Sequence, residues 1–151
     1  MNRRGRLRQR VNPKRRIARL SASEKEKLSW LASKACYRGN PVHKRNPGDF
    51  RLDPPARPRP DKSLCDEAGV TCREIAQGLL EEGMRRGLVD GFVKPKGFPK
   101  HVWAVAGDVV FEAVLDNRET GYYHGYPLPP HDPFVRKVLE AWPERGAEKN
   151  R

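Results

Sequence analysis

The chain has 151 residues and a formal net charge of +12, from 31 Lys and Arg against 19 Asp and Glu. That size fits one modest domain with tails, and that charge favours a polyanionic partner, most often nucleic acid. Three cysteines are too sparse a set for a disulfide framework, and no apolar run approaches a membrane span, so we expect a cytoplasmic protein with no membrane contact.

The positive charge is concentrated at the N-terminus. Residues 1–20 contain nine basic residues and no acidic one. The rest of the chain keeps 22 basic residues (31 less 9) against 19 acidic ones, a charge of only +3. A block of like charge is typical of a disordered arm that adds salt-sensitive affinity for phosphate. We therefore expect residues 1–20 to be a disordered Arg-rich tail, residues 21–143 a single domain, and residues 144–151 a second disordered tail.

Two helices are predicted in the first half of the chain. Ser23 and Glu26 match a capping box, and the apolar spacing that follows predicts a helix over 23–37, with Cys36 as one of its small buried side chains. Six of the fourteen prolines lie in 41–60, which predicts a long proline-rich loop over 38–62. A second capping box and a glycine stop at Gly87 predict a helix over 71–86.

The second half of the chain predicts strands and a last helix. Segments 101–105 and 109–115 are rich in β-forming residues, and the turn signal between them contains Gly107. A third strand is expected over 122–126, and Asp132 should cap the final helix. The order is helix, long loop, helix, three-stranded antiparallel meander and helix, which predicts an α+β fold.

The most informative stretch is the third predicted strand. Three of the four tyrosines and one of the four histidines lie within residues 122–126. In a regular strand Tyr122, His124 and Tyr126 share one face, so His124 would lie between two rings that can stack on bases. A histidine also moves protons near neutral pH. We interpret His124 as a catalytic residue and Tyr122, Tyr123 and Tyr126 as substrate contacts, against the alternative of a purely structural cluster.

The proline-rich loop supplies the other candidate residues. RNA carries its own nucleophile, so cleavage needs a base, an acid and cations at the phosphate. His43 would share the acid and base roles with His124, and Lys44 would assist catalysis as a cation. Arg45 and Arg51 would bind phosphate. This scheme requires His43 and His124 to lie within roughly 10 Å of each other, because both must reach one scissile phosphate.

No metal or cofactor is expected. Cys65 and Cys72, with His43 or His101, lack the tight ligand pairs that zinc sites usually show. His101 is expected to begin a strand, and His131 to lie near a helix cap, so neither is assigned a catalytic role. These considerations favour acid–base chemistry that needs no metal.

The size, the charge and the element order over about 23–142 resemble small bacterial ribonuclease toxins of the RelE/barnase-like kind. The resemblance implies an RNA substrate, such as RNA on the ribosome, no metal, and an inhibitory partner protein (an antitoxin). A rival interpretation is a winged-helix module that would contact DNA phosphates through Arg73, Arg85 and Arg86. A third is a structural RNA-binding protein whose basic tail enters folded RNA. RNA is favoured over DNA as the partner.

Overall fold

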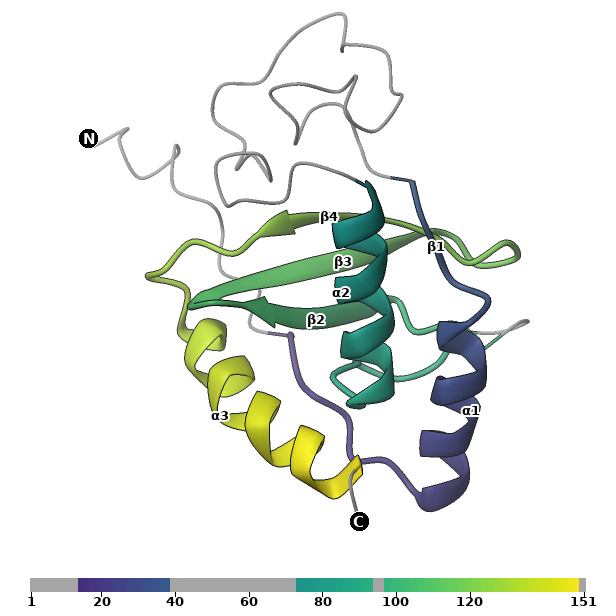
Figure 1. The fold of residues 1–151 in the computed structure, drawn as a ribbon, viewed down its shortest axis with the longest axis horizontal. Helices are drawn as coiled ribbons and strands as arrows, with labels where there is room; N and C mark the ends of the chain where they lie inside the picture. The colour runs from purple at the N-terminus through teal and green to yellow at the C-terminus, as the bar shows by residue number, and fades with distance from the viewer. Residues whose placement is uncertain (1–13, 39–72, 94–96, 150–151) are drawn as a thin grey trace, which may run out of the picture.

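A computed structural model describes residues 14–38, 73–93 and 97–149, with the side chains of the last helix described as far as residue 143. The predicted α+β class is confirmed (Figure 1). No helix in these ranges is long and apolar enough to cross a membrane. The elements in chain order are α1 (Ala22–Ala32), β1 (Cys36–Tyr37), α2 (Arg73–Arg85), β2 (His101–Ala106), β3 (Val109–Asn117), β4 (Tyr122–Pro127) and α3 (Pro133–Lys149).

The sheet has four strands in the order β1-β4-β3-β2. The predicted meander is present, because β2, β3 and β4 pair in antiparallel fashion. The prediction of only three antiparallel strands is wrong, because β1 pairs in parallel with β4 at the edge. Cys36 N donates to Gly121 O at 2.9 Å, and Arg38 N donates to Tyr123 O at 2.8 Å. These bonds place Cys36 in a strand and not in the expected helix.

The first helix is shorter than predicted and begins earlier. It ends at Ala32, not at residue 37, and its N-cap is Ser21, not Ser23. Ser21 Oγ accepts from Glu24 N at 3.2 Å, and Glu24 Oε1 accepts from Ser21 N at 3.0 Å. Two Ser-x-x-Glu boxes overlap in this stretch, and the structure uses the first of them.

The other helix ends follow the sequence more closely. Gly87, with φ of 75°, follows α2 in the left-handed conformation that favours glycine. Asp132 Oδ1 accepts from Phe134 N at 2.9 Å and so caps α3, which begins at Pro133. The expected disordered tail from residue 144 is wrong as far as Lys149, because α3 continues to that residue. The proline-rich loop lies, beyond Arg38, outside the described residues.

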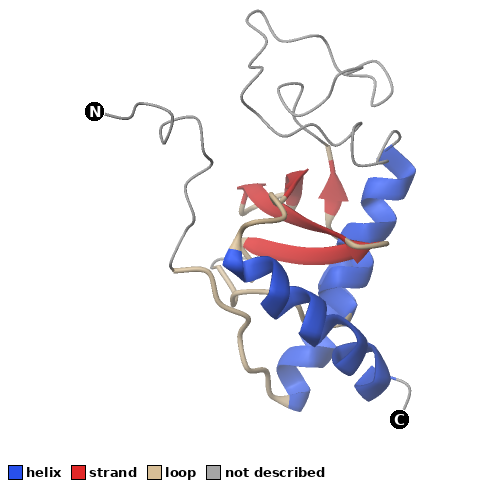
Figure 2. Ribbon diagram, turned by 90° about the vertical axis from the view of Figure 1, so that its left-hand side faces the viewer, coloured by secondary structure: helices blue, strands red, loops and turns tan. Residues whose placement is uncertain are grey.

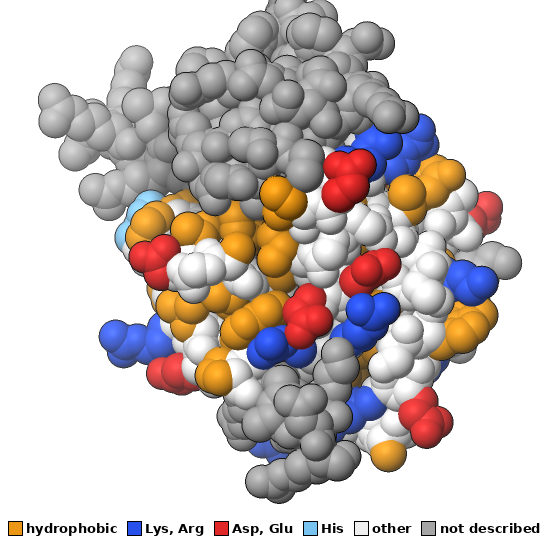
Figure 3. Space-filling model, in the orientation of Figure 1, with side chains coloured by type: hydrophobic (Ala, Val, Ile, Leu, Met, Phe, Trp, Pro, Cys, Tyr) orange, Lys and Arg blue, Asp and Glu red, His pale blue; other side chains and the backbone are white. Residues whose placement is uncertain are grey.

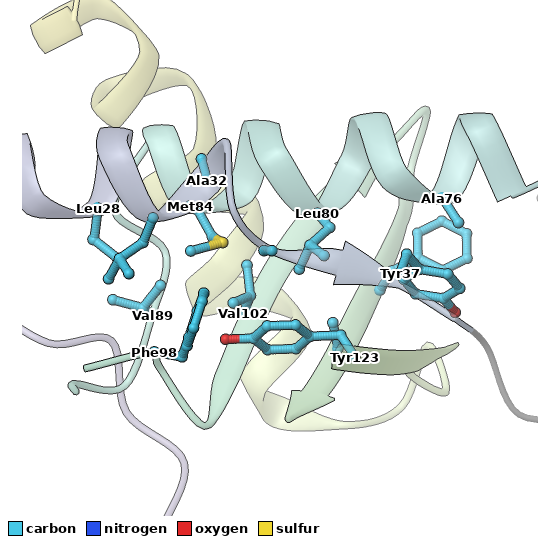
Figure 4. Packing of buried hydrophobic residues seen from close by; sticks show 14 residues of the cluster. Leu28, Ala32, Tyr37, Ala76, Leu80, Met84, Val89, Phe98, Val102 and Tyr123 are labelled. Atoms are coloured by element: carbon cyan, nitrogen blue, oxygen red, sulfur yellow. The ribbon is translucent and has the colours of Figure 1, made fainter. Parts of the chain in front are cut away.

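One face of the sheet packs against α1 and α2. Its core side chains come from both helices, from the sheet and from the segments beside it (Figure 4). Leu28, Met84 and Tyr123 are completely buried there. Gly83 in α2 lets the helix backbone approach β2 closely, because a Cβ at this position would lie 2.4 Å from Trp103 O. This face is a conventional apolar core.

The opposite face packs against α3 and the segment that precedes α1. Figure 2 shows α2 on one side of the sheet and the segment before α1 on the other, next to α3. Trp103, Val110, Phe134 and Val138 are buried in this second cluster, and Ile17 packs against it. Both faces of the sheet are therefore covered, one by α1 and α2 and the other by α3 and the segment before α1. The face toward α3 is covered only in part.

The basic N-terminal segment joins the fold earlier than predicted. Arg15 is held by Glu112 and Asp132, at 2.6 Å from Glu112 Oε1 and 2.9 Å from Asp132 Oδ2. Ala18 N donates to Val89 O at 2.8 Å. A disordered tail up to residue 20 is therefore incorrect, and the domain includes residues from at least Arg15 onward.

Candidate functional site

The side chains of β4 divide between the two faces of the sheet as strand alternation predicts. Tyr122, His124 and Tyr126 lie on the α3 side and are partly exposed, whereas Tyr123 and Gly125 are buried on the α2 side. The shared face of the first three residues is therefore confirmed. Tyr123 is on the wrong side to join them.

Tyr123 is a core residue and not a substrate contact. Its ring lies among the apolar side chains between the sheet and the two helices (Figure 4). Its hydroxyl donates a hydrogen bond to Pro99 O. Burial, and then the charge of Asp90, raise the pKa of this phenol. A buried, neutral, hydrogen-bonded tyrosine holds the core together, so the predicted role in substrate binding is corrected.

His124 is bonded to a carboxylate that an irregularity in the sheet puts in place. Its Nδ1 lies 2.5 Å from Asp116 Oδ1. The register of β3 against β4 shifts between Leu115 and Asn117, so Asp116 is the extra residue of a bulge. Such bulges redirect a side chain and are frequent beside active sites. The result is a histidine–aspartate dyad on the partly exposed face.

Tyr122 carries a cation above its ring. The guanidinium carbon of Arg38 lies 4.6 Å from the centre of the Tyr122 ring. Arg38 N also donates to Tyr123 O, which fixes the backbone from which this side chain extends. An arginine over an exposed aromatic ring can bind a phosphate while the ring stacks on a base.

Beside the dyad, on the same face of the sheet, lies a buried polar network centred on Glu112. Arg15 donates to both carboxylate oxygens of Glu112 and to Asp132, and Trp103 Nε1 donates to Glu112 Oε1 at 3.1 Å. The Tyr126 hydroxyl donates to Glu112 Oε2. Tyr126 therefore presents the side of its ring, while its hydroxyl is bound inside the protein. This network holds the residues beside the dyad in place.

The network sets the charges of its members. Burial raises the pKa of Glu112, but the hydrogen bonds from Arg15, Tyr126 and Trp103 and the charge of Arg15 outweigh burial and lower it. Burial and the Glu112 charge raise the pKa of Tyr126. These shifts favour a carboxylate at Glu112 and a neutral phenol at Tyr126 near neutral pH, and both groups are already engaged in the buried network.

The structure adds one residue that the sequence interpretation passed over. His101 pairs with Val114, and Val114 pairs with His124, so the two histidines lie on the same face in one row across three strands. His101 Nδ1 lies 2.6 Å from Asp90 Oδ2. The sequence contains a signal for this pairing. Counting outward along both strands from the two-residue turn at Gly107 pairs residue 101 with residue 114.

The loop candidates cannot be joined to this face by geometry. His43, Lys44, Arg45 and Arg51 lie outside the described residues. Their roles, and the required approach of His43 to His124, stay predictions. Within the described ranges, no group of three or more His, Cys, Asp or Glu side chains is arranged to hold a metal ion.

An apolar hollow lies on the other side of the sheet. Figure 3 shows apolar side chains gathered over the strands beside α2. The hollow there is lined mainly by apolar residues of α2 and the sheet, among them Leu79, Ala104, Phe111 and Ala113. In register, these strand residues alternate with the row of histidines. The hollow therefore opens on the side of α2, although Glu112 and Tyr126 also contribute to its lining.

Comparison of the chain with protein-family models, with curated proteins and with solved structures finds no match.

Proposed function

We propose that this chain is a cytoplasmic, toxin-like ribonuclease that cleaves RNA by histidine acid–base chemistry on the polar face of its sheet. The observation that carries the proposal is the His124–Asp116 dyad, which lies beside the Arg38–Tyr122 stack on a partly exposed surface. A carboxylate on Nδ1 orients an imidazole and leaves Nε2 as the atom that can face a ligand. His124 is thus equipped to exchange a proton with a ligand on this face.

The neighbouring groups supply binding. Tyr122 and Tyr126 offer ring surface on either side of His124, and Arg38 offers a cation at the same edge. Base stacking on an aromatic ring contributes about 1–3 kcal/mol and depends little on sequence. Lys44, Arg45 and Arg51 would add phosphate contacts from the loop, and the basic residues of 1–20 would add salt-sensitive affinity.

The proposal includes a protein partner. A ribonuclease that acts on the RNA of its own cell needs an inhibitor, and an antitoxin that covers Tyr122 and His124 would block both binding and proton transfer. RNA on the ribosome and other cellular RNA are both candidate substrates. The chemistry proposed for the polar face needs no metal.

Cleavage of RNA in the presence of EDTA tests the proposal. The full chain is incubated with structured RNA, unstructured RNA and translating ribosomes, and His124→Ala is compared with His131→Ala, which replaces an exposed histidine before α3. We expect His124→Ala to lower the rate by about 10²–10⁴-fold, because a positioned acid or base contributes that much. RNA binding and the melting temperature should stay close to those of the parent.

Two results would overturn the proposal. One is that none of the RNA substrates is cleaved, which leaves a binding protein; a preference for duplex DNA would then point to the winged-helix alternative. The other is equal activity of the two histidine variants, which would make the His124–Asp116 dyad structural. Activity that EDTA abolishes would show that the chemistry depends on a metal.

A further inference from the structure

We propose that His101 is the second proton-transfer residue of this site, acting with His124 on one phosphodiester. This inference rests on the ribonuclease function proposed above. It gives the role assigned to His43 to a residue whose position the structure defines.

The strand register places the two histidines together. His101 and His124 are the direct cross-strand neighbours of Val114, one on each side. Directly paired residues point to the same face of a sheet. Adjacent strands lie about 4.8 Å apart, so the two histidine backbones are separated by about 10 Å. Imidazole side chains that extend from the same face at this spacing can reach the two sides of one phosphate group.

The two histidines have matching surroundings. Each is bonded through Nδ1 to an aspartate, His101 to Asp90 at 2.6 Å and His124 to Asp116 at 2.5 Å. Each side chain is 17% exposed. The row across the sheet therefore reads His101, Val114 and His124, with Asp90 bonded to the first histidine and Asp116, from the bulge of β3, bonded to the second.

Each histidine also packs beside an aromatic ring two residues further along its strand. The His101 and Trp103 rings are stacked with their centres 6.0 Å apart, and the His124 and Tyr126 rings are tilted with their centres 6.4 Å apart. Trp103 and Tyr126 both donate to the buried Glu112 carboxylate. One buried group thus fixes the rings beside both histidines, which is how a rigid scaffold positions a pair of reacting groups.

The carboxylates determine which nitrogen reacts. When Nδ1 bears the proton that is donated to the aspartate, Nε2 carries the lone pair in the neutral ring and the second proton in the charged ring. Nε2 is therefore the proton-exchanging atom of both histidines. Asp90 and Asp116 act through the rings and are positioning residues.

The reaction balances with these two groups alone. One histidine, neutral, takes the proton of the ribose 2′-hydroxyl while the 2′-oxygen forms a bond to phosphorus. The other, protonated, gives its proton to the 5′-oxygen as the bond from phosphorus to that oxygen breaks. The products are a 2′,3′-cyclic phosphate and a 5′-hydroxyl, and proton exchange with water restores both rings. No oxidant, metal or second substrate is consumed.

Single-turnover cleavage by the full chain tests the assignment, with His101→Ala, His101→Gln and His43→Ala compared with the parent. We expect His101→Ala and His101→Gln to lower the cleavage rate by about 10²–10⁴-fold and to remove one limb of the bell-shaped pH–rate profile. His43→Ala should keep both limbs. His101→Gln keeps a polar side chain of similar size, so it reports on chemistry if the alanine variant does not fold.

A substrate with an activated leaving group separates the two roles. A uridine 3′-(4-nitrophenyl phosphate) releases a phenolate that needs no proton from an acid. The variant of the acid histidine should regain most of its rate on this substrate, whereas the variant of the base histidine should not. Asp90→Asn should lower kcat more than it raises KM, because Asp90 positions His101 and does not bind RNA.

The outcomes distinguish this inference from the function on which it rests. If His124→Ala is inactive while both His101 variants keep parental rates and both pH limbs, the inference is wrong and the ribonuclease proposal stands. If His43→Ala instead removes a limb, the loop histidine is the partner. If His124→Ala is also fully active, the proposed function itself fails.

Discussion

The two faces of the sheet are built by different physical means. The face toward α1 and α2 is apolar and is filled by closely packed side chains. Leu28, Met84 and Tyr123 are completely buried there. The face toward α3 also buries a charged residue, Glu112, which is 1% exposed. A charge can be buried only if hydrogen bonds and an opposite charge replace water. Packing on the first face therefore depends mainly on the size and shape of apolar side chains. The second face also requires specific hydrogen-bond and ion-pair partners for its buried charge.

That requirement explains why the polar face is the functional candidate. The partners of Glu112 come from the N-terminal segment, β2 and β4, so the carboxylate joins parts of the chain that are distant in sequence. Its neighbours Trp103 and Tyr126 each pack beside one of the two histidines. Buried polar networks that are fully bonded rigidify their surroundings. A rigid network beside two titratable groups can hold them in the fixed geometry that acid–base chemistry requires.

The largest expected effect comes from removing Arg15, the cation that pairs with the buried Glu112 and Asp132. Arg15→Met leaves Glu112 and Asp132 buried without their opposite charge. Breaking a buried ion pair in this way costs about 3–5 kcal/mol. We expect the free energy of unfolding, measured by urea denaturation, to fall by that amount. Arg16→Met removes an exposed arginine next to it and should change stability by less than about 0.5 kcal/mol.

The pH dependence of stability is the companion measurement. The pKa of Glu112 is lower in the folded chain than in the unfolded chain. Its contribution to stability is therefore present above the unfolded pKa and is lost as the pH falls through the folded pKa. In Arg15→Met this loss should begin at a higher pH. Equal stability of the two methionine variants, with the same acid dependence, would show that the network contributes nothing.

The sequence located the residues of the polar face better than it located their partners. Strand alternation placed Tyr122, His124 and Tyr126 on one face, because the period of a strand is a local property. The pairing of Arg15 with Glu112 spans 97 residues, and no local pattern encodes it. β1 could not be predicted for the same reason. A two-residue parallel strand forms its hydrogen bonds only with a segment that is distant in the sequence.

Two features at the edges of elements could not be read from the sequence, each for a specific reason. Overlapping Ser-x-x-Glu boxes left the start of α1 undecided in sequence, and the structure uses the one that begins at Ser21. His101 was given no catalytic role because it begins a strand. Its aspartate lies eleven residues away at position 90, and only the fold brings the two side chains together.

A substitution in α2 tests the packing of the apolar face. A Cβ at Gly83 would lie 2.4 Å from Trp103 O and 2.9 Å from Val102 Cγ1. Because backbone must move to admit it, we expect Gly83→Ala to cost about 1–3 kcal/mol, as overpacking does. Gly78→Ala in the same helix meets nothing within 4 Å and should stabilise the protein by up to about 1 kcal/mol through helix propensity. Thermal unfolding of both variants gives the comparison.

The Gly83 and Gly78 variants also test whether the apolar face is coupled to the polar face of the sheet. Trp103 contributes its carbonyl to the contact with α2 and its indole to Glu112. If the two faces are coupled through β2, Gly83→Ala should lower RNA cleavage as well as stability, whereas Gly78→Ala should leave cleavage unchanged. Stability equal to that of Gly78→Ala would mean that α2 moves away from the sheet at little cost.

The smallest expected effect uses one substitution on both faces of β4. Tyr123→Phe removes a hydrogen bond to the neutral carbonyl of Pro99, and Tyr126→Phe removes one to the Glu112 carboxylate. Hydrogen bonds between neutral groups contribute about 0.5–1.5 kcal/mol, and those to charged groups about 1.5–3 kcal/mol. We expect Tyr126→Phe to be the more destabilising by about 1 kcal/mol in urea denaturation, although Tyr123 is the more deeply buried residue. The opposite order would mean that burial, and not the charge of the partner, sets the strength of these hydrogen bonds. The two faces would then differ in composition but would be stabilised by hydrogen bonds of the same kind.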